Sequence, residues 1–196
     1  IFAHRLDVRD LTFDMDLSGK ALHAQLGELS ARGAYGPKTR AAIEKLKLSA
    51  DLDGERALDL HSEYAEWAEQ KGGKAALAGE LADAALRVVY VVPALDDSTR
   101  WPVRRAELHL TGLRNRALAR LGYGDAAQLR VPVDLHVKAA TSGPAHELLS
   151  AQLDLHAGKA RLALTARASP STYAAEVALD PVNLAQISGI LPELNA

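Results

Sequence analysis

The fold of this chain is decided by the stretch from Leu149 to Leu179, LSAQLDLHAGKARLALTARASPSTYAAEVAL. Apolar side chains occupy every second position in three segments, which the turns Ala157-Gly158-Lys159 and Ser169-Pro170-Ser171 separate. A period of two is typical of a β-strand with one apolar and one polar face, and short turns join antiparallel neighbours. The stretch therefore predicts three antiparallel strands that follow one another as a meander.

The same alternation recurs towards the N-terminus. The turn Ser18-Gly19-Lys20 and the turn Asp53-Gly54-Glu55 each separate two alternating segments, so two hairpins are expected early in the chain. Further strands are expected at residues 86–92, 106–110 and 129–137. Residues 75–85 mix Ala and Leu without clean alternation, so a helix is possible there. Short helices are expected at residues 114–121 and 181–194.

These elements predict a mainly β fold: an antiparallel meander that forms a curved, groove-like sheet, shaped like a taco, with one or two short helices. No shift in composition marks a boundary inside residues 1–196, so we expect a single β-rich segment. Its first residues, Ile1-Phe2-Ala3-His4-Arg5, contain neither an initiator Met nor a signal peptide. We therefore expect an internal piece of a longer protein.

Composition argues against several classes of function. With 23 Lys and Arg against 25 Asp and Glu, the formal charge of −2 gives no field to attract nucleic acid. The absence of Cys excludes thiolate nucleophiles and zinc-thiolate sites. Only 5% of residues are aromatic although 48% are hydrophobic, which disfavours a ligand pocket of an enzyme. We expect no catalysis and no cofactor.

One tetrad recurs three times: an Asp and a His stand two positions apart at Asp59 and His61, Asp134 and His136, and Asp154 and His156. Side chains two apart share one face of a strand, so each pair could chelate a metal ion or serve as base and orienting acid. Alternatively, these Asp and His residues form the solvent-exposed face of a strand whose Leu residues are buried. We favour that solvated face, so no metal site is expected.

The C-terminal stretch carries a family resemblance. Residues 171–184, STYAAEVALDPVNL, followed by Ile187, Ile190 and Leu191, resemble a repeat ending of the TamB and AsmA group of bacterial envelope proteins. The pattern of alternating strands and turns at residues 6–20 and 46–54 also resembles sequences of that group. The resemblance implies a parent protein anchored in the inner membrane that crosses the periplasm as a curved sheet. It also implies contact with phospholipid and a part in phospholipid transport or outer-membrane assembly, with outer-membrane assembly proteins as further partners.

The predicted groove is an apolar face that contacts phospholipid or other acyl chains, because such a strip needs Leu, Val and Ala without charges. The same faces closed over a second sheet would give a β-sandwich, a module that presents Tyr64, Trp67 and Trp101 to a glycan or a protein. The pattern leaves both open. Residues expected in the groove are Leu11, Phe13, Met15, Leu17, Leu46, Leu48, Leu135, Val137, Leu153, Leu155, Leu162, Leu164, Val177 and Leu179.

Overall fold

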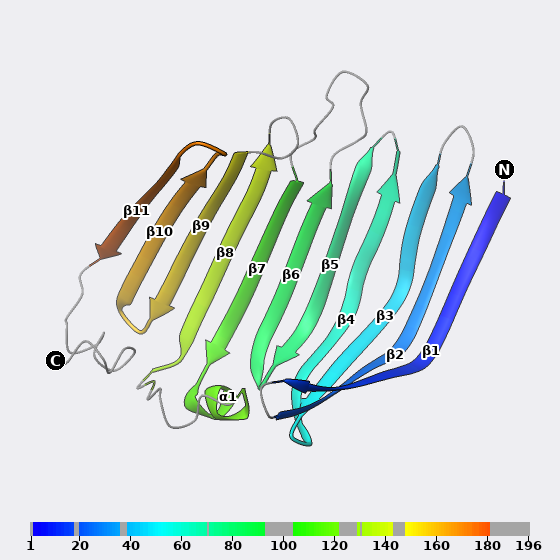
Figure 1. The fold of residues 1–196 in the computed structure, drawn as a ribbon, viewed down its shortest axis with the longest axis horizontal. Helices are drawn as coiled ribbons and strands as arrows, with labels where there is room; N and C mark the ends of the chain where they lie inside the picture. Colours follow the sequence, from blue (N-terminus) through cyan, green and yellow to red (C-terminus); the bar gives the residue numbers. More distant parts are fainter. Residues whose placement is uncertain are drawn as a thin grey trace.

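The computed structural model of the chain describes residues 2–17, 20–35, 39–69, 71–92, 104–121, 129, 131–142 and 148–180. All strands within these ranges belong to one antiparallel sheet of eleven strands, and the strand order follows the chain from β1 to β11 (Figure 1). The strands are β1 Phe2–Leu17, β2 Lys20–Tyr35, β3 Arg40–Leu52, β4 Glu55–Ala68, β5 Gly72–Leu81, β6 Ala84–Val92, β7 Arg104–Leu113, β8 Val133–Ser142, β9 Leu148–Ala157, β10 Ala160–Ala168 and β11 Tyr173–Asp180. The predicted antiparallel meander is confirmed, and the sheet is not closed.

Tight two-residue turns set the register of the early hairpins. Asp53 and Gly54 join β3 to β4 with φ angles of 51° and 81°, and Ala82 and Asp83 join β5 to β6 with φ angles of 47° and 75°. Positive φ at both central residues is the geometry that matches the twist of a hairpin. The first turn is also fixed to β2, because the Ala21 amide donates to the Asp53 carboxylate over 2.9 Å.

Strands β1 and β2 are each 16 residues long, longer than the alternation indicates, because the alternation changes phase within them. The apolar positions of β1 run through Leu6 and Val8 and then continue at Leu11. Of the two residues between them, Asp10 has a φ of 54°, and the register between β2 and β3 shifts next to Gly27. Such bulges bend a strand, and both strands bend in Figure 1. The extra residues keep the apolar side chains on one face on both sides of the bend.

The first half of the sheet is curved into a trough. A hollow of about 870 Å³ is lined by residues of β1 through to β6, including His4 and Val92. In a flat sheet these two strands would lie ~24 Å apart, at ~4.8 Å for each of five steps. Strands so far apart share one hollow because the sheet curves.

One short helix, α1 (Asn115–Arg120), follows β7 and lies at the lower end of the central strands in Figure 1. Its Ala117 is buried, and Arg120 forms ion pairs with Glu55 and Asp83, which belong to the ends of two hairpins. The predicted helix at residues 114–121 is therefore confirmed. No helix in the described part of the chain combines the length and the apolar character that crossing a membrane requires.

The buried core is small, as expected for a single layer. It centres on Leu60, Leu86 and Leu110, which are 6–8% exposed, together with the completely buried Ala84. Among the described residues no large side chain is completely buried. The described strands form no second sheet, so the closed sandwich that the sequence left open does not form from them.

Two sequence-based expectations are corrected. Residues 75–85 are not helical: β5 runs to Leu81 and pairs with β4 and β6 along its length. Alternation is hidden there because Ala76 and Ala78 lie on the polar face. An ion pair between Glu63 of β4 and Arg87 of β6 (2.8 Å) spans the width of β5, which only small side chains leave room for.

The predicted strand at 129–137 begins later, at Val133, so Leu129 and Val131 precede it. The expected helix at 181–194 lies outside the described residues, as does Trp101.

Candidate functional site

A row of leucines crosses the whole sheet on one face. Backbone pairing places residues of all eleven strands side by side in this row, which we call the leucine row. Ten members are Leu and one is Gly. In strand order, the leucine row consists of Leu11, Leu26, Leu48, Leu60, Gly79, Leu86, Leu110, Leu135, Leu155, Leu162 and Leu179.

Gly79 interrupts the leucine row because its position has no room for a side chain. A Cβ atom there would lie 1.9 Å from the Asp59 carbonyl oxygen and 3.0 Å from the Leu60 Cα. Backbone of β4 therefore occupies the space that a leucine would need. The single gap in the row is a consequence of close strand approach and adds no polar group.

A second apolar row runs parallel to the first. Its continuous part, from β5 to β11, comprises Leu77, Val88, Leu108, Val137, Leu153, Leu164 and Val177. On the other side of β4 it is continued by the paired residues Val8, Leu29 and Leu46. Ser62 stands at the junction, where its hydroxyl accepts a hydrogen bond from the Leu46 amide over 2.9 Å.

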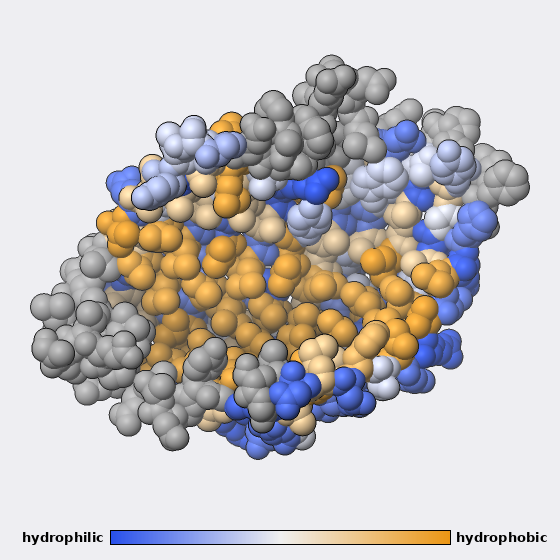
Figure 2. All heavy atoms as spheres, in the orientation of Figure 1, coloured by the Kyte–Doolittle hydropathy of each residue, from blue (hydrophilic) through white to orange (hydrophobic). Residues whose placement is uncertain are grey.

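A third row is built almost entirely of small side chains. From β5 onward it consists of Ala75, Tyr90, Ala106, Ala139, Ala151, Ala166 and Ala175. None of the residues in the three rows is charged. Figure 2 shows the result: apolar side chains gather in one patch across the sheet, with polar residues at its margins. We call this patch the apolar face.

The structure brings the predicted groove residues together. All fourteen lie in strands, and Leu11, Leu48, Leu135, Leu155 and Leu162 stand in the leucine row. Phe13 and Met15 continue the same face of β1 and are about half exposed. Leu17 and Leu179 are placed by their backbone pairing, and their side chains lie outside the described residues.

The prediction missed the residues at the centre of the apolar face. Leu60, Leu86 and Leu110 are only 6–8% exposed, yet only the pairing of strands shows that they share one row. Alternation within each strand identifies an apolar side. It does not show which positions of distant strands lie next to one another.

The hollow at one end of the first six strands is lined by residues of both faces, several of them charged. The residues lining the 870 Å³ hollow include five cations and one acid, Glu66. Trp67 lies against Gly73, where a Cβ atom would come within 2.8 Å of the indole ring. The cations are Arg5, Arg32, Arg40, Lys71 and Lys74. Backbone pairing places Arg5, Arg32, Glu66 and Lys74 in one row, offset by one residue from the apolar positions of their strands. These charges therefore lie on the polar face and not in the groove.

The aromatic pair of the sandwich hypothesis is divided between the faces. Tyr64 pairs with Ala76 and Trp67 pairs with Gly73, an odd separation that places the two side chains on opposite sides of the sheet. They therefore do not form one aromatic platform.

The Asp-x-His tetrads lie on the polar face, and the structure gives two of their aspartates other partners. Asp134 accepts a hydrogen bond from the Gly112 amide (2.8 Å) at an irregularity of β7. Asp154 accepts one from Arg161 (2.6 Å), and this contact holds the pKa of Asp154 below its usual range. Both carboxylates are thus bound by groups outside their own tetrads.

Comparison with known proteins adds no assignment: no family model, no curated protein and no solved structure matches this chain.

Proposed function

We propose that this chain is a lipid-contacting segment of a β-groove protein in the bacterial periplasm, as the resemblance to the TamB and AsmA group implies. In this proposal the apolar face contacts the acyl chains of phospholipid. The parent protein, anchored in the inner membrane, would serve phospholipid transport or outer-membrane assembly. No catalytic step is involved.

The observation that carries the proposal is the uncharged leucine row, which continues across every strand of the sheet. At ~4.8 Å per strand, ten steps give an apolar strip ~48 Å long. The row is buried at its centre, at Leu60, Leu86 and Leu110, and open towards β1, where Leu11 is 44% exposed. Monomeric proteins rarely expose a large apolar patch unless it binds something. Because the strip offers no hydrogen-bonding groups, its occupant must be apolar along its length.

The energetics suit an acyl chain. Each methylene transferred from water to an apolar surface contributes about 0.8 kcal/mol, so a chain that covers only a few strands already binds measurably. Leu11, Phe13 and Met15 remain 44–53% exposed, which leaves apolar surface for a ligand to cover. Sliding along the strip breaks and forms equivalent contacts, as transport requires.

The test is site-specific photo-crosslinking in cells. Photoreactive residues placed at Leu48, Leu135 and Leu164 on the apolar face are expected to give lipid adducts. The matched controls Lys47, His136 and Ala163 precede or follow these residues by one position and therefore lie on the polar face.

Lipid adducts confined to the apolar-face positions would support the proposal. Equal labelling of the two faces would contradict it. Adducts to protein alone at the apolar-face positions would also contradict it, and would indicate a protein-binding module in place of a lipid groove.

A further inference from the structure

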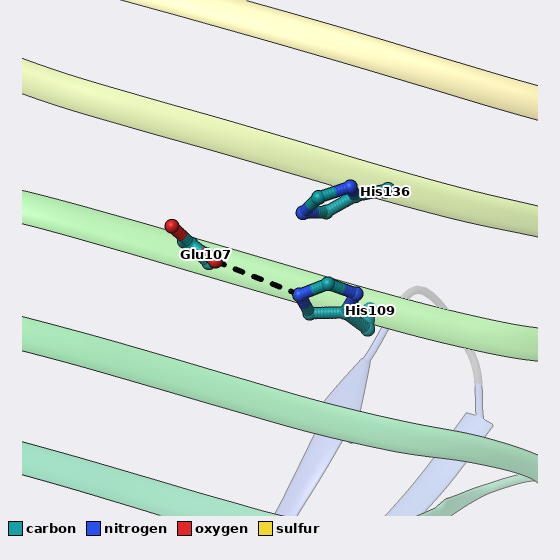
Figure 3. A group of neighbouring side chains, drawn as sticks. All are labelled: Glu107, His109 and His136. Atoms are coloured by element: carbon teal, nitrogen blue, oxygen red, sulfur yellow. Dashed lines mark ion pairs between the residues drawn. The ribbon is translucent and has the colours of Figure 1, made fainter.

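The polar face, opposite the proposed groove, holds a cluster of two histidines and one glutamate. His109 of β7 and His136 of β8 are directly paired across the two strands. Their rings stack with centroids 3.8 Å apart at an interplanar angle of 25° (Figure 3). Glu107 lies two residues before His109 on the same face, and its Oε2 is 3.6 Å from His109 Nε2. In the described ranges this is the one group of three side chains whose potential ligand atoms lie within 4.8 Å of each other.

His136 has a polar atom without a partner. Its Nε2 is shielded from solvent and makes no hydrogen bond. Buried polar atoms are almost always paired, so an unpaired one needs an explanation. A bound cation would supply one, because a neutral imidazole nitrogen is a common metal ligand.

The surroundings keep His136 in the neutral form that binds metal. Burial, and then the neighbouring His109 and Lys138, lower the pKa of His136, against the weaker opposite effects of Glu107 and Asp154. A lowered pKa favours the neutral imidazole, which is the form that binds a metal ion.

We propose that Glu107, His109 and His136 form a binding site for a divalent transition-metal ion of the zinc type. Two imidazoles and a carboxylate are a ligand set that zinc accepts, whereas calcium and magnesium prefer oxygen ligands throughout. Three protein ligands leave a fourth position to water.

The distances agree with such a site after small side-chain rotations. With zinc-to-nitrogen bonds of about 2.0–2.1 Å, ligand atoms at two corners of a tetrahedron lie ~3.4 Å apart. The Glu107–His109 separation of 3.6 Å is already close to this value. The two stacked rings would have to splay so that both nitrogens point at one ion.

The first test is calorimetric titration of the purified chain with zinc chloride at pH 7.5. One ion should bind per chain, and H109Q or H136Q should weaken binding by at least ~100-fold, the upper end of what even an outer-shell partner contributes. E107Q keeps the shape of the side chain and should weaken binding by at least ~10-fold. Circular dichroism verifies that each variant is folded.

The matched control is His61→Gln. His61 belongs to the same row of the polar face, where pairing connects it through Ala78 and Arg87 to His109, but it has no second histidine beside it. Its replacement should leave zinc binding unchanged. Binding that survives H109Q and H136Q, or that H61Q abolishes, would overturn the proposal, as would the absence of stoichiometric binding to the unmodified chain.

Cobalt provides a second readout. Co²⁺ bound at a site of this kind should show the visible absorption of a four-coordinate ion, and the signal should be lost in H109Q and H136Q. A spectrum of fully hydrated cobalt would contradict the assignment. The site is on the face opposite the groove, so neither result depends on lipid binding.

Discussion

Replacing Leu60 with Ala tests whether the leucine row is packed at its centre and open at its edge. Shortening Leu to Ala removes about three carbons at ~0.8 kcal/mol each, or ~2.4 kcal/mol for a fully buried side chain. Because Leu60 is 7% exposed, the transfer free energy lost is ~2.2 kcal/mol. The cavity left among Leu48, Leu86 and the other neighbours raises the expected loss of unfolding free energy to ~3 kcal/mol. Leu11 is 44% exposed in the same row, so its replacement should cost only ~1.3 kcal/mol.

The assay is urea unfolding of the purified chain, followed by tryptophan fluorescence and circular dichroism. Leu11→Ala is the matched control, because it removes the same atoms from the same register row. The expected result is a free energy of unfolding that falls by about twice as much or more for Leu60→Ala. Equal losses at the two positions would refute the reasoning, since Leu11 would then be as well covered as Leu60.

Two further predictions concern single positions. Gly79→Ala should lower the free energy of unfolding by about 3 kcal/mol or more, because its Cβ atom would lie 1.9 Å from the Asp59 carbonyl oxygen. Gly33→Ala is the control, because the nearest atom to its Cβ would be 3.7 Å away and little loss is expected. Thermal unfolding of both variants measures the difference. The pKa of His136 is lowered from 6.5 in the folded chain, so the unfolded chain binds more protons below that pH and stability should fall as the pH drops through 6.5. His136→Gln should remove this part of the decline in a series of unfolding curves from pH 7.5 to 5, and an unchanged decline would contradict the assignment.

The strands could be predicted because burial on one face imposes a period of two. Leu153 and Leu155, or Leu162 and Leu164, identify their strands without any knowledge of neighbours. Where burial departs from one face, the pattern fails. Ala76 is buried on the polar face under a salt bridge between the neighbouring strands. The sequence of β5 therefore shows no apolar–polar alternation and is also compatible with a helix.

The arrangement of the candidate sites could not be predicted in the same way. The leucine row depends on bulges at positions such as Asp10 and Gly27, whose location follows from strand pairing over long distances. The sequence pattern pairs His136 with Asp134, whereas its neighbour in the sheet is His109, 27 residues earlier, in a segment without the tetrad. The Asp-x-His motif relates residues along one strand, whereas the cluster of Glu107, His109 and His136 forms between two strands.

The strict chain order of the sheet makes its size adjustable. Because each described strand from β1 to β11 pairs only with its neighbours in the chain, backbone pairing between strands does not fix their number. Duplication or loss of one hairpin changes the length of the sheet by ~9.6 Å, two strand spacings, and leaves the chain direction and the facing of each side chain intact. Loss of a single strand would reverse the direction of all that follow. A gene encoding such a sheet can therefore evolve a longer or shorter molecule in whole-hairpin steps, with the register of each remaining pair preserved.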